Sequence, residues 1–558
     1  MKVDIRWQLL LVVICLGLVV SLLSYQIQSA GLCTTRVPST GGRLGVGMVG
    51  RPDKINPLLG TSNPVDLELI NLIYDGLMRY DEAGMPVPSL AKSWHVSDDG
   101  KTLSFELRDD ISWHDGQPFT AADVVFTYGL LQNEEFPAPE SLGSLWNSVI
   151  ISSTNESTVD LILPQPYGPF LDATTLGILP SHILNGIPAN KLANHTFNRS
   201  PVGTGPFAVS QIFDWEEAGQ LRLIPDPGHW RGGVQIDTLD YRFYPDNESV
   251  GEAFSTGAIQ AISGISPEAV PEFLALPGVR LYTSPGRQIT QLLFNLSSSG
   301  SPLVNSAQGR QALALGTNRP LLIDEAITGQ GLPLEGPYIP GSWAFNPEAV
   351  APVDYNPATA SAILEELGWH IADGTATREK DGLPLVLKLL SVDDDPGREL
   401  AQTLASQWAE IGIDVEPIVV APDEMTTALS DKAFDVAIVQ VLTAGDPDLY
   451  DFWSQEAIVS GQNYGGWNNR RASEDLEIGR QLYLVDERLP YYTAFLRSFG
   501  EDLPAFTLLQ HVDNFALSET IQKAEVGRFQ QPRDRYDSLA NWFMLYREVS
   551  IACSEGEA

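Results

Sequence analysis

Between residues 383 and 441 the sequence alternates strand-like apolar runs with a helical pattern. The apolar runs cover residues 385–390, 413–420 and 434–441. Between the first two, Leu400, Leu404 and Trp408 recur at the spacing of one helix face. Strands that alternate with helices pair mostly in parallel, because the helix carries the chain back across the sheet. The sequence therefore predicts an α/β fold, in which ligands bind beyond the carboxyl ends of the strands.

The chain is too long for a single hydrophobic core. Its 558 residues suit two or three domains of about 100–200 residues each. The 71 Asp and Glu residues against 34 Lys and Arg residues give a net charge of −37. So much negative charge disfavours broad binding to nucleic acid or to anionic lipid. We expect no nucleic-acid partner and a soluble extracytoplasmic protein. Solubility alone explains this charge as well as a ligand-related role does.

The first 33 residues differ from the rest of the chain. Lys2 and Arg6 precede an uncharged apolar run at 9–23, which is typical of a signal peptide. Extended to Ile27, the run approaches the ~17–20 residues that just span a bilayer. We therefore expect residues 1–33 to be a signal peptide or an N-terminal membrane anchor formed by residues 9–27, with the folded part in the periplasm or at the cell surface.

The three cysteines leave two alternatives open. Cys15 lies in the apolar run, Cys33 follows it, and Cys553 lies near the C-terminus. Export would permit a disulfide between Cys33 and Cys553, and two unpaired thiols are the alternative. Lipidation of Cys33 fits poorly, because Leu32 stands where a small residue is usual.

The segment from 76 to 128 has the pattern of a strand, a turn and a helix. Leu103, Phe105 and Leu107 alternate with polar residues, which predicts a strand with one buried face. Thr120, with an acidic residue three positions later, predicts the start of a helix. We expect three large side chains of this segment to be packing groups rather than ligand contacts. These are Trp94, Trp113 and His114.

This segment resembles the signature of the extracellular solute-binding proteins of family 5. It reads Ser89-Leu90-Ala91-Lys92-Ser93-Trp94 and then Trp113-His114-Asp115-Gly116-Gln117-Pro118-Phe119-Thr120-Ala121-Ala122-Asp123. Further matches are Gly203-Thr204-Gly205-Pro206-Phe207 and Asn463-Tyr464-Gly465-Gly466-Trp467-Asn468-Asn469. The resemblance covers about residues 44–545. The family serves ABC importers of the oligopeptide, dipeptide and nickel class. It implies a periplasmic-binding-protein type II-like α/β fold, with two lobes around a cleft and an extra small α+β subdomain.

The resemblance also implies how the chain is divided. Domain I, the first lobe, is expected to consist of residues 44–80, 197–290 and 490–545. Domain II, a subdomain of that lobe, is expected to cover residues 81–196, and domain III, the second lobe, residues 291–489. Residues 34–43 would then be a linker and residues 546–558 a tail.

The resemblance places candidate ligand contacts in the loop after the strand that ends at 441. In relatives this loop carries an acidic residue that pairs with the α-ammonium group of a peptide, and such pairing offsets the cost of burying the charge. Here the loop is shorter and that residue is absent, so we choose Asp446 with its neighbours Gly445, Ala444 and Thr443. A turn or helix-capping role is the alternative for Asp446.

Four more residues complete the expected site. Tyr464 and Trp467 are candidate aromatic walls, because aromatic rings give contact area with few torsions to freeze, although packing explains them too. Asn295 ends the strand that is expected to cross between lobes, and Leu58 lies in a turn that faces the cleft in relatives.

Nothing in the sequence indicates catalysis. The seven histidines show no zinc-ligand spacing, and no G-x-S-x-G motif is present. The acidic run 393–395 precedes Pro396 and a helical pattern, where negative charge favours the helix dipole. We expect no enzyme activity, no catalytic residue, no metal and no cofactor.

The expected function is that of the solute-binding component of an ABC importer. Ligand would stabilise the closed arrangement of the lobes, which the membrane permease would then recognise. Peptides lead as ligand class, with nickel chelates and oligosaccharides as alternatives, because a fold does not determine its ligand. A membrane-tethered sensor without transport is the rival function. We expect the protein to act as a monomer.

Overall fold

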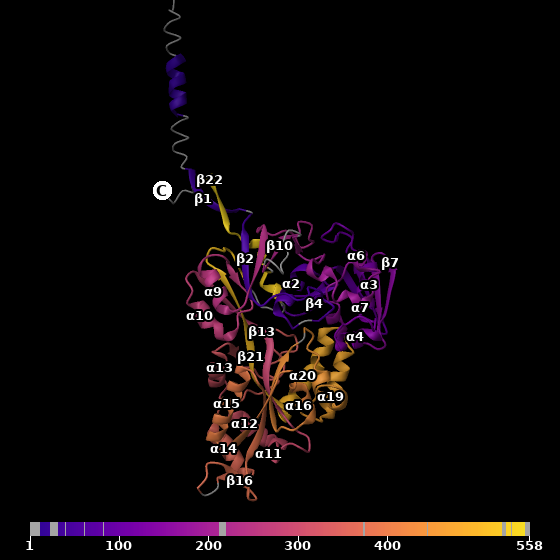
Figure 1. Ribbon diagram of the computed structural model, residues 1–558, viewed down its shortest axis with the longest axis vertical. Helices are drawn as coiled ribbons and strands as arrows, with labels where there is room; N and C mark the ends of the chain where they lie inside the picture. The colour runs from indigo at the N-terminus through magenta and orange to yellow at the C-terminus, as the bar shows by residue number, and fades with distance from the viewer. Residues whose placement is uncertain are drawn as a thin grey trace, which may run out of the picture.

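The computed structural model describes residues 12–22 and 32–552, apart from gaps at 40, 61, 82, 211–218, 372–373, 444, 527–531 and 537. An 11-stranded mixed sheet runs through two lobes along the long axis of the molecule, with helices packed against it in both (Figure 1). The strand order is β19-β18-β20-β13-β21-β12-β2-β11-β10-β9, and β14 (Gly331–Leu332) pairs with β21.

Lobe 1 is built on β2 (Arg43–Val49), which pairs in parallel with β11 (Thr238–Tyr244) and β12 (Ala261–Ile262). Leu44, Val46 and Met48 alternate along β2 and are at most 1% exposed. The other strands of the sheet here are β10 (Gln220–Pro225) and β9 (Phe207–Val209). The helices are α2 (Pro64–Ile73), α9 (Asn247–Ser255) and α10 (Val270–Leu274). A two-stranded sheet of β3 (Met78–Tyr80) and β4 (Pro86–Pro88) leads to the subdomain.

The subdomain holds a separate antiparallel sheet in the order β5-β6-β8-β7. The strands are β5 (Ala91–Val96), β6 (Thr102–Leu107), β7 (Ile150–Asn155) and β8 (Thr158–Ile162). The helices are α3 (Ala121–Leu131), α4 (Glu140–Asn147), α5 (Phe170–Ala173), α6 (Ser181–Leu184) and α7 (Ala189–Leu192). Its apolar side chains merge with those of lobe 1 in one continuous core. The subdomain is therefore packed as part of lobe 1.

The predicted strand and the predicted helix start of this segment agree with the structure. Leu103, Phe105 and Leu107 are at most 1% exposed on β6, and Thr120 with Asp123 forms a capping box at the start of α3. Trp113 is buried and donates its indole N–H to Asp123. Alternation and capping depend on residues that are close together in the sequence, so both could be predicted without knowledge of the fold.

Lobe 2 contains the alternating pattern with which the sequence analysis began. β18 (Val386–Val392) pairs in parallel with both β19 (Asp414–Val420) and β20 (Val436–Leu442), and α15 (Asp395–Glu410) joins the first two. The other helices are α11 (Pro302–Asn305), α12 (Ala307–Leu315), α13 (Arg319–Ile327), α14 (Pro357–Glu366), α16 (Met425–Asp431), α17 (Tyr450–Trp453), α18 (Ala457–Ser460) and α19 (Arg470–Arg480). A small sheet of β15 (His370–Ile371), β16 (Arg378–Lys380) and β17 (Leu383–Pro384) lies apart from the main sheet.

Two long antiparallel strands cross between the lobes. They are β13 (Val279–Phe294) and β21 (Ala505–Ser518). The ladder is interrupted between Pro285 and Ile289, where the register shifts. On one side of the shift β21 also pairs with β12 of lobe 1, and on the other side β13 pairs with β20 of lobe 2. The irregular pairing therefore marks the junction of the lobes.

Two expected boundaries fall inside single elements. The boundary at residue 490 lies within α20 (Val485–Asp502), and the start of lobe 2 at residue 291 lies within β13. Tyr492, Phe495 and Phe499 of α20 are buried in the core of lobe 2. The chain therefore returns to lobe 1 along β21, because the apolar face of α20 holds that helix in lobe 2.

The ends of the folded part differ from the expected linker and tail. β1 (Leu32–Ser39) pairs with β22 (Leu545–Ala552) in a two-stranded antiparallel ribbon that projects from lobe 1 (Figure 1). Residues 34–39 of the expected linker and residues 546–552 of the expected tail are thus paired, and the β-branched residues in both segments suit a strand. The pairing could not be read from either segment alone.

A helix at residues 12–22 stands apart from the lobes with its apolar side chains exposed. Within the described part of the chain, every helix falls short of the length and apolarity that crossing a bilayer requires. Residues 1–11 and 23–31, on which the expected signal peptide or anchor also depends, lie outside the described residues. Cys553 lies outside them too, and with it the expected disulfide.

Candidate ligand site between the lobes

A cavity of about 510 Å³ lies between the lobes. Its walls come from residues 56–71 of lobe 1, 142–177 of the subdomain and 446–462 of lobe 2. The volume falls within the range of roughly 300–1,000 Å³ that is usual for small-molecule sites. The charged side chains among its lining residues are Asp172, Asp446, Asp448 and Asp451. The cavity therefore presents carboxylates from both sides of the cleft.

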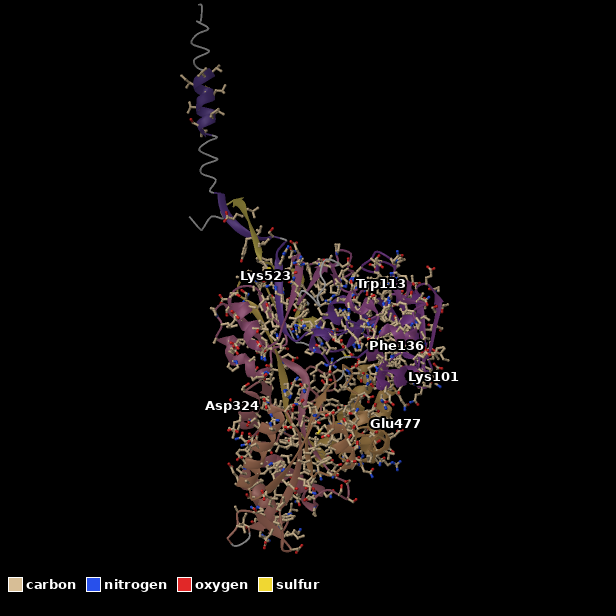
Figure 2. All side chains as sticks on the ribbon, in the orientation of Figure 1. Lys101, Trp113, Phe136, Asp324, Glu477 and Lys523 are labelled. Carbon is tan, nitrogen blue, oxygen red and sulfur yellow. The ribbon has the colours of Figure 1, made fainter. Side chains whose placement is uncertain are left out.

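A second cavity of about 640 Å³ continues the first along the boundary between the subdomain and lobe 2. The two share Leu145, Tyr167 and Asp451 in their walls. In Figure 2, Lys101 of the subdomain and Glu477 of α19 mark the two parts that meet on this side of the molecule. The shared walls make one elongated groove with room for an extended ligand.

The subdomain and lobe 2 are in direct contact in this structure. The hydroxyl of Tyr483 donates to the carbonyl of Gly100 at 2.8 Å and accepts from the Tyr167 N–H at 3.2 Å. The Gly168 N–H donates to the carbonyl of Arg480 at 2.8 Å. These bonds link the subdomain directly to lobe 2, so the two sides of the cleft are in contact in this structure.

The loop after β20 borders the cavities, where the rule for α/β sheets places a ligand site. Thr443 lines two smaller cavities of about 60 and 190 Å³, and its hydroxyl donates to the carbonyl of Arg287 at 2.8 Å. Gly445 lies against the ring of Tyr80, so closely that a side chain at this position would clash with the ring. Ala444 lies outside the described residues.

Asp446 is already paired within the protein. Its carboxylate makes a bidentate ion pair with Arg488 of α20, in which Nη2 and Oδ1 are 2.7 Å apart. The two side chains are only 7% and 3% exposed. Oδ1 also accepts from the Asp448 N–H at 3.0 Å. Asp446 lines the cleft as expected, but the carboxylate that the sequence suggested for an ammonium group is held by Arg488.

Aromatic rings surround this ion pair. The Arg488 guanidinium lies 4.7 Å from the ring centre of Trp343 and 5.1 Å from that of Tyr492. Burial alone would lower the pKa of Arg488. The carboxylate of Asp446 raises it, and the pKa lies above its usual value. The bidentate contact constrains the geometry of both side chains, which suits a structural support for the loop.

Asp448 has an arginine partner as well. Its Oδ2 lies 2.9 Å from Nη2 of Arg480, at the end of α19. Burial raises the pKa of Asp448 to about 6, although Arg480 acts in the opposite direction. The guanidinium lies between the rings of Tyr450, at 4.2 Å, and Tyr167, at 4.9 Å. Arg480 thus connects lobe 2 with the subdomain beside the cavity.

Asp172 of α5 faces this loop from the opposite side of the cleft. Its Oδ2 accepts from the Asp446 N–H at 2.6 Å, and its buried Oδ1 has no hydrogen-bond partner among the described residues. Burial and, to a smaller extent, the charge of Asp446 raise the pKa of the Asp172 carboxyl to about 7. Asp172 could not be predicted from the sequence, because a single Asp in a Pro- and Gly-rich segment carries no local signal of what faces it.

The remaining expected contacts separate into two groups. Tyr464 lines the 190 Å³ cavity together with Thr443. Trp467, Asn295 and Leu58 are at most 3% exposed and are not among the residues that line the cavity between the lobes. Their motifs mark packing positions next to the cleft.

Each of these three has a role in the interior. Trp467 packs against three aromatic rings of lobe 2 and donates to Asp502 at 2.8 Å. Asn295 donates to the carbonyls of Lys432 and Phe434. Leu58 belongs to the core of lobe 1.

Among the described residues, no group of three or more His, Cys, Asp or Glu side chains could hold a metal ion. Most acidic residues of the cleft form ion pairs with one of two arginines and do not converge on one point.

The sequence profile of the bacterial extracellular solute-binding proteins, family 5 Middle, matches residues 85–459. The chain belongs to this family. The resemblance noted in the sequence and the expected type II-like two-lobed fold are thereby confirmed. Family 5 proteins are extracytoplasmic and act as the solute-binding components of ABC importers, and this chain shares that general role.

Three comparisons illustrate the relationship. The oligopeptide-binding protein AppA of Bacillus subtilis is 25% identical over 527 residues, covering 91% of this chain and 92% of AppA. The nickel-binding periplasmic protein of Escherichia coli is 28% identical over 376 residues, covering 65% of this chain and 68% of that protein. The structure of B. subtilis AppA in complex with a nonapeptide superposes with a TM-score of 0.68 at 24% identity, covering 91% of this chain and all of that one.

Proposed function

We propose that this family 5 protein binds peptides in the cleft between its lobes and delivers them to an ABC permease. The observation that carries the proposal is the elongated groove, whose walls come from the lobe 1 side and from lobe 2. A peptide in this groove would touch both lobes at once and so favour closure. The similarity to an oligopeptide-binding protein over nearly the whole chain supports the same ligand class.

The residues proposed to contact the ligand are those that border the cavities. From lobe 2 these are Thr443, Gly445, Asp446 and Tyr464. The ring of Tyr464 offers an apolar wall, and the loop 443–446 offers backbone groups near the cleft. Side chains that are buried in the two cores do not belong to the proposed contact surface.

Isothermal titration calorimetry with peptide libraries tests the proposal. The purified protein is first unfolded and refolded to remove any bound ligand, and is then titrated with libraries of two to nine residues. We expect peptides to bind with dissociation constants in the micromolar range or tighter. Binding of nickel chelates or oligosaccharides, with no binding of any peptide library, would contradict the proposal.

A nickel chelate is the second candidate ligand. The acidic lining of the main cavity and the similarity to a nickel-binding periplasmic protein favour it over other solutes. Native mass spectrometry of the protein as purified distinguishes the candidates, because a retained chelate adds the mass and isotope pattern of nickel.

We also propose that residues 1–33 direct export of the chain and that the protein acts as a monomer. Lys2 and Arg6 ahead of the apolar run at 9–23 support the export signal. Whether the segment is cleaved or retained as an anchor follows from the N-terminal sequence of the mature protein.

A further inference from the structure

The main cavity is acidic, but its carboxylates are not equivalent. Asp446 is paired with Arg488, and Asp448 and Asp451 both lie within ion-pair distance of Arg480. All three belong to lobe 2 and have cationic partners from lobe 2. Asp172 lies on the opposite side of the cleft, and among the described residues it makes no ion pair with an arginine, lysine or histidine within 4.0 Å.

The surroundings of Asp172 leave its charge poorly compensated. One carboxylate oxygen accepts the Asp446 N–H at 2.6 Å, while the other is buried without a hydrogen-bond partner among the described residues. Burial raises the pKa of Asp172 most, and the carboxylate of Asp446 raises it further, whereas the Asp446 N–H, the hydroxyl of Tyr80 and the guanidinium of Arg287 lower it by less. A buried carboxylate is costly unless a cation or several donors meet it, so Oδ1 is a buried acceptor on the cavity wall that lacks a donor among the described residues.

The position of Asp172 explains how a ligand would reach that oxygen. Its bond to the Asp446 N–H joins the subdomain to lobe 2, so opening of the cleft breaks this bond and uncovers the carboxylate. A ligand that enters the open cleft meets an ionisable acceptor on the lobe 1 side. Closure then brings the Asp446 N–H back to Oδ2 and encloses Oδ1, which is buried in this structure, together with the charged group of the ligand.

We propose that Asp172 binds the positively charged group of the ligand, a primary ammonium such as the amino terminus of a peptide, from the lobe 1 side of the cleft. The proposal rests on the peptide-binding function proposed above. It moves the cation contact from the loop at 446, where the carboxylate is held by Arg488, to the opposite wall. A compact monovalent ammonium suits one available carboxylate oxygen, whereas a divalent metal prefers several oxygen ligands.

The test compares tetrapeptides that carry a free amino terminus with the same library after N-acetylation. Acetylation removes the positive charge and leaves the side chains and the rest of the backbone unchanged. We expect the wild-type protein to bind the free-amine library about tenfold to a hundredfold more tightly, because hydrogen bonds to charged groups contribute of that order. Calorimetry measures both affinities.

The variant Asp172→Asn assigns the effect to this residue. It keeps the shape and an acceptor oxygen but removes the charge, so we expect the preference for the free amine to disappear. Asp324→Asn is the matched control, because it removes a carboxylate from an exposed position on α13, where the side chain does not line any of the cavities described above. This control should retain the preference. If Asp172→Asn does not fold, Asp172→Ser serves instead, because it adds no amide donor beside the Asp446 N–H.

The outcomes separate this inference from the proposed function. Equal binding of both libraries by the wild-type protein, or an unchanged preference in the Asp172 variant, would overturn the role of Asp172 and leave peptide binding intact. Binding of neither library would overturn peptide binding and, with it, the inference.

Discussion

At the scale of single residues, Asp446 shows how one residue type can suit two roles. An Asp in a cleft loop is a reasonable partner for an ammonium group, and the same carboxylate is equally able to accept a bidentate arginine. The structure shows the second arrangement, with both side chains almost fully buried. The sequence could not distinguish these roles, because Arg488 follows 42 residues later on another helix.

The first prediction concerns this ion pair. Arg488→Met would leave Asp446 buried beside an apolar side chain, and removing one member of a buried pair typically costs about 3–5 kcal/mol. We expect the free energy of unfolding to fall by that order, measured by urea denaturation.

Arg470→Met is the matched control for this prediction. Arg470 pairs with Glu474 on the surface of α19, and its side chain is 82% exposed. An exposed pair contributes about 0–1 kcal/mol. Equal unfolding free energies for the two variants would show that the buried pair does not stabilise lobe 2.

At the scale of elements, short loops and strand ends control how the lobes meet. β20 ends at Leu442, and the loop after it reaches the subdomain through the Asp446 N–H and through the contact of Gly445 with Tyr80. The absence of a side chain at Gly445 permits this approach. The loop is therefore part of the closed interface as well as of the cavity wall.

The second prediction is that Gly445→Ala hinders closure of the cleft. The added methyl group would meet the ring of Tyr80, and overpacking of this kind commonly costs about 1–3 kcal/mol. Because the clash exists only when the lobes are closed, we expect roughly tenfold weaker ligand binding with little change in unfolding free energy. Calorimetry and urea denaturation measure the two quantities.

The control is Gly129→Ala within α3, where no other atom lies within 4 Å of the added carbon. It should leave binding unchanged. Unaltered affinity in Gly445→Ala would mean that Tyr80 and Gly445 do not meet in the ligand-bound protein.

At the scale of the whole molecule, two lobes share one sheet through β13 and β21. The register shift between Pro285 and Ile289 interrupts their pairing at the junction, so bending there disturbs few ladder hydrogen bonds. The lobes otherwise meet through side chains and loops around the cleft. This arrangement suits rotation of one lobe against the other.

The third prediction is that ligand reduces the size of the molecule in solution. Without ligand, opening of the cleft would hydrate its buried carboxylates, and this gain competes with the contacts that hold the two sides together. We therefore expect a population of open molecules. Small-angle X-ray scattering should show a smaller radius of gyration after addition of a peptide that binds in the calorimetry experiments. A radius that stays constant with every ligand that calorimetry detects would exclude closure as the mechanism.

Local patterns in the sequence determined much of this protein. The alternation in β6, the cap of α3 and the strand–helix–strand order of lobe 2 each depend on neighbours in the chain, and each was predicted correctly. The family motifs extended this to the two-lobed fold. The physical reason is that secondary structure and burial periodicity are encoded within short windows.

Only the tertiary structure decided which groups meet across the cleft. The Asp446–Arg488 pair, the contact of Asp172 with the Asp446 N–H and the pairing of β1 with β22 join residues 42, 274 and about 500 positions apart. The sequence around a charged residue or a strand-forming segment does not identify the distant residues with which it pairs. The placement of α20 in lobe 2 was likewise decided by the core that receives its apolar face, because such packing depends on the folded chain as a whole.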